Sequence, residues 1–176
     1  SDLGFGESIP GLLRRGTADY TPPERIRDLD SLPWPEYSPF PMHAYMNHVI
    51  LSSRGCPFAC SFCAIRHIWG RHWFYRSIDN VLDEMEFVAK EYGDKVFHIN
   101  DDNFSLRPER VEQFTAGLLR KKRRYRWIAQ GVRADKVNRT ILKLMRKSGC
   151  ERISIGVESA DPDVLKAIGK QESVEQ

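Results

Sequence analysis

From His48 to the end of the chain, short β-rich runs alternate with amphipathic runs, and this alternation restricts the fold more than any other feature. The expected strands are residues 48–51, 95–100, 127–130 and 152–157. The expected helices are residues 77–92, from 108 onward, 138–147, and from 161 to the chain end. Four strand-then-helix units in succession predict parallel strands with right-handed crossovers, and therefore an α/β sheet or barrel. A complete barrel has eight such units in about 250 residues, so the four units of this chain supply about half of one.

Several residues mark the expected helix ends. Ser77 and Asn138 can cap helix N-termini, and Pro108 suits a first helical position, where an N–H group would have no partner. Gly93 and Gly149 follow the periodic runs and are expected to end two of the helices.

The first 46 residues differ from the rest of the chain. Seven of the ten prolines lie before residue 42, and no apolar period is sustained there. We expect residues 1–46 to be an irregular Pro-rich linker and residues 47–176 to be the α/β unit. Because Ser1 is not an initiator Met and no secretory signal follows it, we expect a piece of a longer, cytoplasmic protein.

Composition argues against several classes of protein. With 41% hydrophobic and 29% charged residues the chain can bury a core, unlike a disordered segment. No apolar run approaches the ~20 residues of a membrane-spanning helix. A net charge of +3, from 27 basic and 24 acidic residues, is too even for a dedicated polyanion binder. We therefore do not expect a nucleic-acid partner, and we interpret the basic run 120–126 as a solvated helix end.

Three of the four cysteines lie within eight positions, at Cys56, Cys60 and Cys63. A disulfide framework would spread its cysteines along the chain. Three thiolates on one loop suit a soft metal or an iron–sulfur cluster. They are one short of a closed cluster, which leaves one iron free to coordinate a substrate or cosubstrate. Cys150 precedes the last expected strand, at the opposite end of the sheet, and is expected to be a buried core thiol.

A zinc site is the alternative, because Cys60, Cys63 and His67 have finger-like spacing. In that interpretation Cys56, Cys60, Cys63 and His67 would bind one ion, and the chain would be a zinc-binding nucleic-acid module.

Polar residues follow every expected strand, where parallel α/β proteins collect their active sites. They are Arg54, then Asp101-Asp102-Asn103, then Gln130 and Arg133, and finally Glu158-Ser159. Loops are polar in general, so one such residue means little, but four coincident strand ends indicate a site.

The C-x3-C-x2-C loop after the first strand, with the aromatic Phe62 before its last cysteine, resembles the signature of the radical S-adenosylmethionine (radical SAM) superfamily. Further stretches resemble the branch that often carries an N-terminal cobalamin-binding domain. They are Arg54-Gly55-Cys56-Pro57-Phe58, Ile68-Trp69-Gly70-Arg71, Asp101-Asp102-Asn103-Phe104, Gly131-Val132-Arg133-Ala134-Asp135 and Gly156-Val157-Glu158-Ser159. The implied fold is a partial TIM-like barrel of about four βα units.

The N-terminal stretches Ile9-Pro10-Gly11-Leu12 and 29–35 are similar to the passage that joins a cobalamin domain to the barrel in that branch. The histidine signature of the cobalamin domain has no counterpart before Ile9, so cobalamin stays an open cofactor.

The resemblance implies a [4Fe-4S] cluster on Cys56, Cys60 and Cys63 that reductively cleaves S-adenosylmethionine to a 5′-deoxyadenosyl radical. It also implies an electron donor such as a flavodoxin or ferredoxin. The reaction can be a cobalamin-dependent methylation or another radical modification, and the substrate is not indicated. Catalytic residues beyond the cofactor ligands are not indicated either.

Cosubstrate contacts follow from the same resemblance. Asp101 or Asp102 is expected near the ammonium group of S-adenosylmethionine, and Arg133 near its carboxylate. Glu158 is expected to bind the ribose hydroxyls, and the backbone of Phe62 the adenine edge. An aromatic group is expected either to shield the cysteine loop or to line the substrate side, and it consists of Trp69, His72, Trp73, Phe74 and Tyr75.

Overall fold

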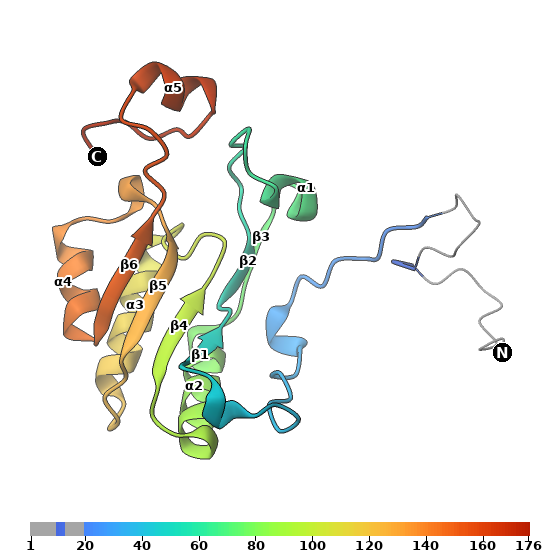
Figure 1. The fold of residues 1–176 in the computed structure, drawn as a ribbon, viewed down its shortest axis with the longest axis vertical. Helices are drawn as coiled ribbons and strands as arrows, with labels where there is room; N and C mark the ends of the chain where they lie inside the picture. Colours follow the sequence, from blue (N-terminus) through green and yellow to red (C-terminus); the bar gives the residue numbers. More distant parts are fainter. Residues whose placement is uncertain (1–9, 13–19) are drawn as a thin grey trace.

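The computed structural model describes residues 10–12 and 20–176, and its centre is a four-stranded parallel sheet. The order β1-β4-β5-β6 joins Asn47–Ile50, Val96–Asn100, Trp127–Val132 and Cys150–Ile155 (Figure 1). One row of paired residues crosses all four strands, namely His48, Phe97, Trp127 and Cys150. The predicted α/β class with parallel strands is confirmed.

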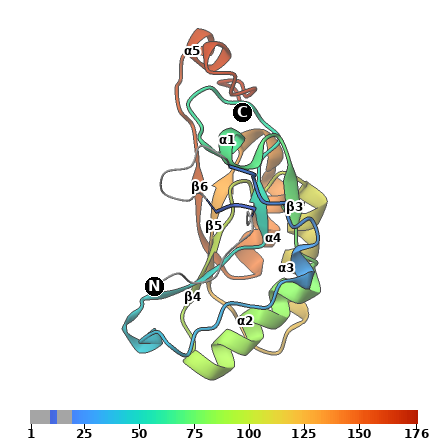
Figure 2. The ribbon, with the colours of Figure 1, turned by 90° about the vertical axis from the view of Figure 1, so that its right-hand side faces the viewer.

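The main helices lie together on one face of this sheet (Figure 2). They are α2 (Ile78–Tyr92), α3 (Pro108–Arg120) and α4 (Arg139–Lys147). The predicted caps are confirmed, since the Ser77 side chain accepts from the Asn80 N–H and the Asn138 side chain from the Ile141 N–H. These polar caps satisfy N–H groups that the first helical turn leaves unpaired.

The core lies between the sheet and these helices. Phe104, Phe114 and Trp127 pack edge to face, with ring centroids 5.1–5.8 Å apart. Cys150 is buried at the start of β6, as predicted. The last strand begins two residues earlier than expected, because Gly149 turns at φ 99° and lets Cys150 pair with Trp127 at once.

A small antiparallel pair of strands was not expected. β2 (Ser53–Gly55) pairs with β3 (Trp73–Tyr75), and the short helix α1 (Ile65–Trp69) lies between them. Gly55 permits this pairing, because at φ 85° a Cβ atom would lie 2.3 Å from the His72 carbonyl oxygen. The hairpin therefore closes the loop that carries the three cysteines.

The expectation that the last helix runs to the chain end is wrong. α5 (Pro162–Ala167) begins where it was expected, with Asp161 as its N-cap, but it is only 6 residues long. Gly169 turns the chain at φ 66°, and Lys170 donates its N–H to the Leu165 carbonyl. Both α5 and the chain end lie beyond the carboxyl ends of the strands, at the top of Figure 1.

The described part of the Pro-rich segment, residues 20–46, contains two 3-10 turns, Leu29–Ser31 and Met42–Ala44. This segment is hydrogen-bonded to the start of α2 and to the residue before β4. The Asp30 carboxylate accepts the Ser77 N–H at 2.9 Å, and the Lys95 ammonium donates to the Met42 carbonyl at 2.6 Å. The boundary at residue 46 stays a prediction, and residues 1–9 and 13–19 of this segment lie outside the described residues.

Three residues of the basic run 120–126 are paired with acidic side chains. Lys121 binds Asp83 and Glu86 of α2, Arg123 binds Asp94, and Arg126 binds Glu151. In the part of the chain that the structure describes, no helix is both long and apolar enough to cross a membrane.

Candidate functional site

The cysteine loop, residues 56–63, lies between β2 and α1 at the carboxyl end of the sheet. Cys56, Cys60 and Cys63 are free thiols, and Cys60 is buried. A turn closed by the Cys63 N–H and the Cys60 carbonyl, at 3.1 Å, brings two of them onto one bend. Burial raises the pKa of Cys60, and the cations Lys170 and Arg133 act in the opposite direction.

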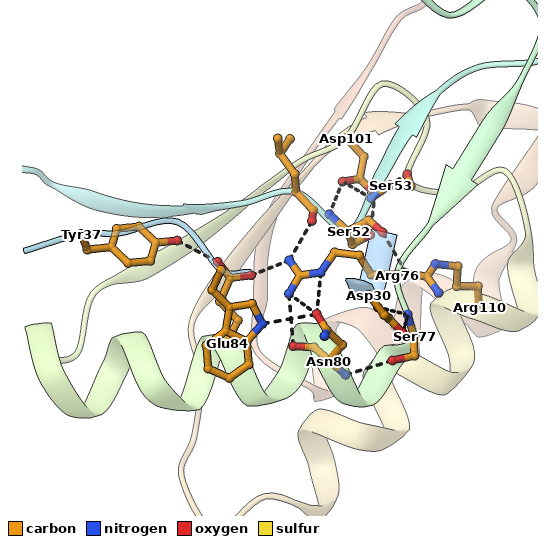
Figure 3. A network of polar contacts seen from close by, with 12 residues as sticks. Asp30, Tyr37, Ser52, Ser53, Arg76, Ser77, Asn80, Glu84, Asp101 and Arg110 are labelled. Atoms are coloured by element: carbon orange, nitrogen blue, oxygen red, sulfur yellow. Dashed lines mark hydrogen bonds and ion pairs between the residues drawn. The ribbon is translucent and has the colours of Figure 1, made fainter. Parts of the chain in front are cut away.

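Asp101, directly after β4, fastens the chain that leads into the cysteine loop (Figure 3). One carboxylate oxygen accepts the N–H groups of Ser52 and Ser53, at 2.7 and 3.1 Å. The other accepts their hydroxyls, at 2.5 and 2.7 Å. Burial raises the pKa of Asp101, whereas these four donors lower it. Both oxygens of this expected ammonium ligand are thus occupied within the protein.

Two arginines, the buried Arg110 and the partly buried Arg76, hold the same stretch from its other side. Arg76 donates to the Leu51 carbonyl at 3.0 Å, and Arg110 donates to the Ser52 carbonyl at 3.1 Å. Backbone groups between β1 and β2 are therefore bound by charged side chains from three other elements. Such charge-assisted bonds are stronger than neutral ones and fix the start of the loop.

The next two residues continue this contact along the chain. Asp102 accepts the Gly55 N–H at 2.7 Å, and its side chain is otherwise exposed. Asn103 is 1% exposed, and its amide nitrogen lies 3.4 Å from the Cys56 sulfur. Three consecutive residues after β4 therefore bind successive positions of the chain that enters the cysteine loop. Of the two aspartates expected near an ammonium group, Asp102 keeps one oxygen that makes no hydrogen bond with the described residues.

Gly131, near the end of β5, lets this arrangement form. It turns at φ 70°, and a Cβ atom there would lie 2.3 Å from the Asp101 carbonyl oxygen. Its own carbonyl accepts the Phe104 N–H at 2.9 Å. Only glycine permits so close an approach of the two loops.

Arg133 connects the cysteine loop with the C-terminal segment, residues 168–172. Its guanidinium lies 3.7 Å from the centroid of the Phe58 ring and pairs with Asp135 at 2.8 Å and Glu172 at 3.2 Å. It also donates to the carbonyls of Lys170 and Gln171. A cosubstrate carboxylate, as expected from the sequence, would have to exchange with one of these partners. That role stays a prediction.

The remaining expected contacts lie at the surface. Phe62 is 54% exposed, and Glu158 lies 3.5 Å from the Lys170 ammonium in a left-handed conformation at φ 63°. The Ser61 N–H donates to the Ile168 carbonyl at 2.9 Å, so the C-terminal segment borders the loop beside Phe62.

Sequence reasoning missed six residues of this site, namely Ser52, Ser53, Arg76, Arg110, Lys170 and Glu172. The two serines carried a usable signal, because a buried carboxylate requires donors and adjacent hydroxyls directly follow the first strand. Lys170 and Glu172 carried no such signal, because the residues around them form no periodic pattern that would indicate a helix or strand.

The donor set fits an iron–sulfur cluster better than the zinc alternative. Among residues 10–12 and 20–176, no group of three or more His, Cys, Asp or Glu is arranged to hold one metal ion. The His67 ring nitrogen is instead paired with Arg66 at 3.1 Å. Thiolates that bind different irons of a cube need not converge on one point, which suits the three free cysteines.

Comparison with known proteins shows the family of the chain. Residues 50–176 match the model of the radical SAM superfamily. An uncharacterized methyltransferase of Pyrococcus horikoshii is 31% identical over 96% of this chain and 39% of its own. The bacteriochlorophyllide d C-12(1)-methyltransferase of Chlorobaculum tepidum is 39% identical over 69% of this chain and 26% of its own. The chain thus spans well under half the length of these relatives.

Solved structures with the same fold include the apo form of OxsB, a cobalamin-dependent S-adenosylmethionine radical enzyme. It superposes with a TM-score of 0.72 at 23% identity, over 89% of this chain and 25% of OxsB. The radical S-adenosylmethionine methyltransferase TsrM from Kitasatospora setae superposes with a TM-score of 0.62 at 21% identity, over 73% of this chain and 26% of TsrM. Both likenesses concern the fold, and they match the partial barrel expected from the motifs. Since the superfamily match covers more than half of its residues, the chain belongs to the radical SAM superfamily.

Proposed function

We propose that the protein containing this chain is a radical SAM enzyme, in which Cys56, Cys60 and Cys63 hold a [4Fe-4S] cluster. When bound, such a cluster supplies the electron that splits S-adenosylmethionine into methionine and a 5′-deoxyadenosyl radical. The observation that carries the proposal is the loop with three free thiols, fastened by residues that follow the adjacent strand. Three protein ligands leave one iron for the cosubstrate.

The chain's own residues would bind and orient that cosubstrate. Within the described part of the chain, one carboxylate oxygen of Asp102 has no hydrogen-bond partner, which supports Asp102 as the partner of the ammonium group. Arg133 is the nearest proposed partner of the carboxylate, at the price of releasing Asp135 or Glu172. Glu158 and the Phe62 backbone are proposed for the ribose and the adenine, because the surface on which they lie borders the cysteine loop.

The finer proposal is methyl transfer that depends on cobalamin. It is supported by methyltransferases among the relatives and by the cobalamin-dependent enzyme OxsB among the structures of the same fold. Cobalamin would be bound outside this chain, whose residues offer no assigned ligand for it. A flavodoxin or ferredoxin in the cytoplasm is the proposed electron donor, and the substrate is left open.

The test uses the full-length protein, purified without oxygen. We expect about four irons per cluster and, with S-adenosylmethionine and a reductant, release of methionine and 5′-deoxyadenosine. A variant with all three loop cysteines replaced by Ala is the matched control. It should contain no iron cluster and should release neither methionine nor 5′-deoxyadenosine. Stoichiometric zinc without iron in the wild-type protein would contradict the proposal. Methyl transfer is tested separately, by following a deuterated methyl group from S-adenosylmethionine with cobalamin present and absent.

A further inference from the structure

We propose that Asn103 is a positioning residue for the cluster, whose side-chain amide donates a hydrogen bond to the Cys56 thiolate and thereby raises the cluster's reduction potential. The inference deepens the proposed function and rests on it, because it presumes a [4Fe-4S] cluster on the cysteine loop.

The contact itself is the first observation. The amide nitrogen of Asn103 lies 3.4 Å from the Cys56 sulfur, and the residue is 1% exposed. Buried amide donors are almost always paired, and the sulfur is the acceptor found here within the described residues. An iron-bound thiolate carries no proton, so the amide must donate rather than accept. The contact is therefore a charge-assisted hydrogen bond when the cluster is present.

The second observation is the unpaired oxygen of the same amide. The Asn103 carbonyl oxygen is buried without any hydrogen-bond partner in the described part of the protein. An unpaired buried acceptor is costly, and an apolar side chain of similar size would avoid the cost. A contact between the nitrogen and a charged sulfur gives a reason to have an amide at this position.

The loop around Asn103 keeps the amide from moving away. Asp101 and Asp102 on one side are bonded to the strand that enters the cysteine loop. Phe104 on the other side donates its N–H to Gly131, whose missing side chain permits the close approach. The donor is thus held by bonds on both flanks, and its distance from the sulfur is set by the backbone.

The effect on potential follows from charge. Reduction adds one electron, supplied by the external donor, and part of the added charge lies on the thiolate sulfurs. A hydrogen-bond donor stabilises the more negative state more strongly, and hydrogen bonds to sulfur are a known determinant of cluster potential. Removing the donor therefore makes the potential more negative and the cluster harder to reduce.

The experiment is a redox titration of the full-length protein, followed by electron paramagnetic resonance of the reduced cluster. Asn103→Leu removes the donor at similar volume, and Asn103→Asp keeps the shape but replaces the donor with an acceptor. We expect both variants to keep the wild-type iron content and to shift to more negative potential, the Asp variant further. Asn100→Leu, the same change three residues earlier on β4, is the matched control and should not shift.

An unchanged potential in an iron-loaded Asn103→Leu or Asn103→Asp protein would overturn the inference. Loss of iron from a folded Asn103→Leu protein would overturn it too. Asn103 would then be needed for assembly of the cluster rather than for its reduction potential. If the variants do not fold, the contact is tested in wild-type protein labelled with 15N in its asparagine side chains. We expect a 15N coupling to the reduced cluster, and its absence would contradict the contact. A wild-type protein without any cluster would instead refute the proposed function.

Discussion

Asp101 and Asp102 are adjacent in sequence and have different surroundings. Asp101 is 4% exposed and accepts four hydrogen bonds from two serines, whereas Asp102 is exposed and accepts one. A carboxylate with four internal donors gains nothing from an added ammonium group. A partly free carboxylate can still bind one. The two positions should therefore respond differently to the same substitution.

We predict that Asp101→Ala lowers the free energy of unfolding by about 3 kcal/mol or more, because it leaves four buried donors unpaired. Asp102→Ala should cost less than about 1 kcal/mol, yet weaken S-adenosylmethionine binding roughly ten- to hundredfold. Denaturant unfolding and isothermal titration measure the two effects. Equal stability losses, or unchanged affinity in the Asp102 variant, would contradict the assignment.

The cysteines offer a similar contrast. Replacing Cys56, Cys60 or Cys63 singly by Ala should abolish the cluster, because two thiolates do not hold a cube. Cys150→Ala should keep the iron and cost about 1 kcal/mol of stability. The Cys150 thiol is buried in the core at the start of β6, which is the end of that strand away from the cysteine loop. Iron analysis of the four variants checks this. Equal loss of iron from the Cys150 variant would mean that the protein closes the cluster with a fourth ligand.

At the scale of elements, the turn near the end of β5 determines how closely two loops approach. Gly131 and Gly93 both have positive φ, of 70° and 86°, but only at Gly131 would a Cβ atom meet a neighbour, the Asp101 carbonyl oxygen at 2.3 Å. Gly93, at the end of α2, has open space around it. Substitutions at these two glycines therefore separate the cost of backbone strain from the cost of steric crowding.

We predict that Gly93→Ala costs about 1–3 kcal/mol, the backbone strain alone of φ 86° and ψ 169°, a region that is nearly exclusive to glycine. Gly131→Ala should cost more and should also lower iron retention, because the loop that binds the cysteine-bearing chain must shift. Thermal unfolding and iron content after gel filtration measure both. A Gly131 variant that behaves like the Gly93 variant would show that the close approach is unimportant for the site.

Elements with local signals were predictable from the sequence. Ser77 and Asn138 cap helices through contacts within three positions, and Pro108 is the first residue of its helix, as predicted. The hairpin of β2 and β3 was not predictable, because each strand is three residues long and pairs across the whole cysteine loop. Asn103 was noted only as a polar strand end, since its contact with Cys56 spans 47 positions.

On the scale of the whole molecule, the Pro-rich segment is fastened to the sheet through α2 (Figure 3). Glu84, 1% exposed on α2, binds Arg76 and accepts the Tyr37 hydroxyl at 2.8 Å. Arg76 in turn reaches the Leu51 carbonyl before the cysteine loop. One buried ion pair thus joins the N-terminal segment, a helix and the site.

We predict that Glu84→Ala costs about 3–5 kcal/mol, because it leaves the Arg76 charge buried without its partner. Tyr37→Phe, the control, removes one hydrogen bond from the same group and should cost about 1 kcal/mol. Chemical denaturation measures the difference. Similar losses in the two variants would mean that Arg76 finds another partner or water.

The central claim is that three cysteines hold a cluster with one iron open to S-adenosylmethionine. The most direct measurement is electron–nuclear double resonance on the reduced full-length protein, with S-adenosylmethionine labelled with 15N in its amino group. The account predicts a 15N coupling to the cluster, because the amino group would bind the open iron. A reduced four-iron cluster that shows no such coupling at saturating cosubstrate would contradict it.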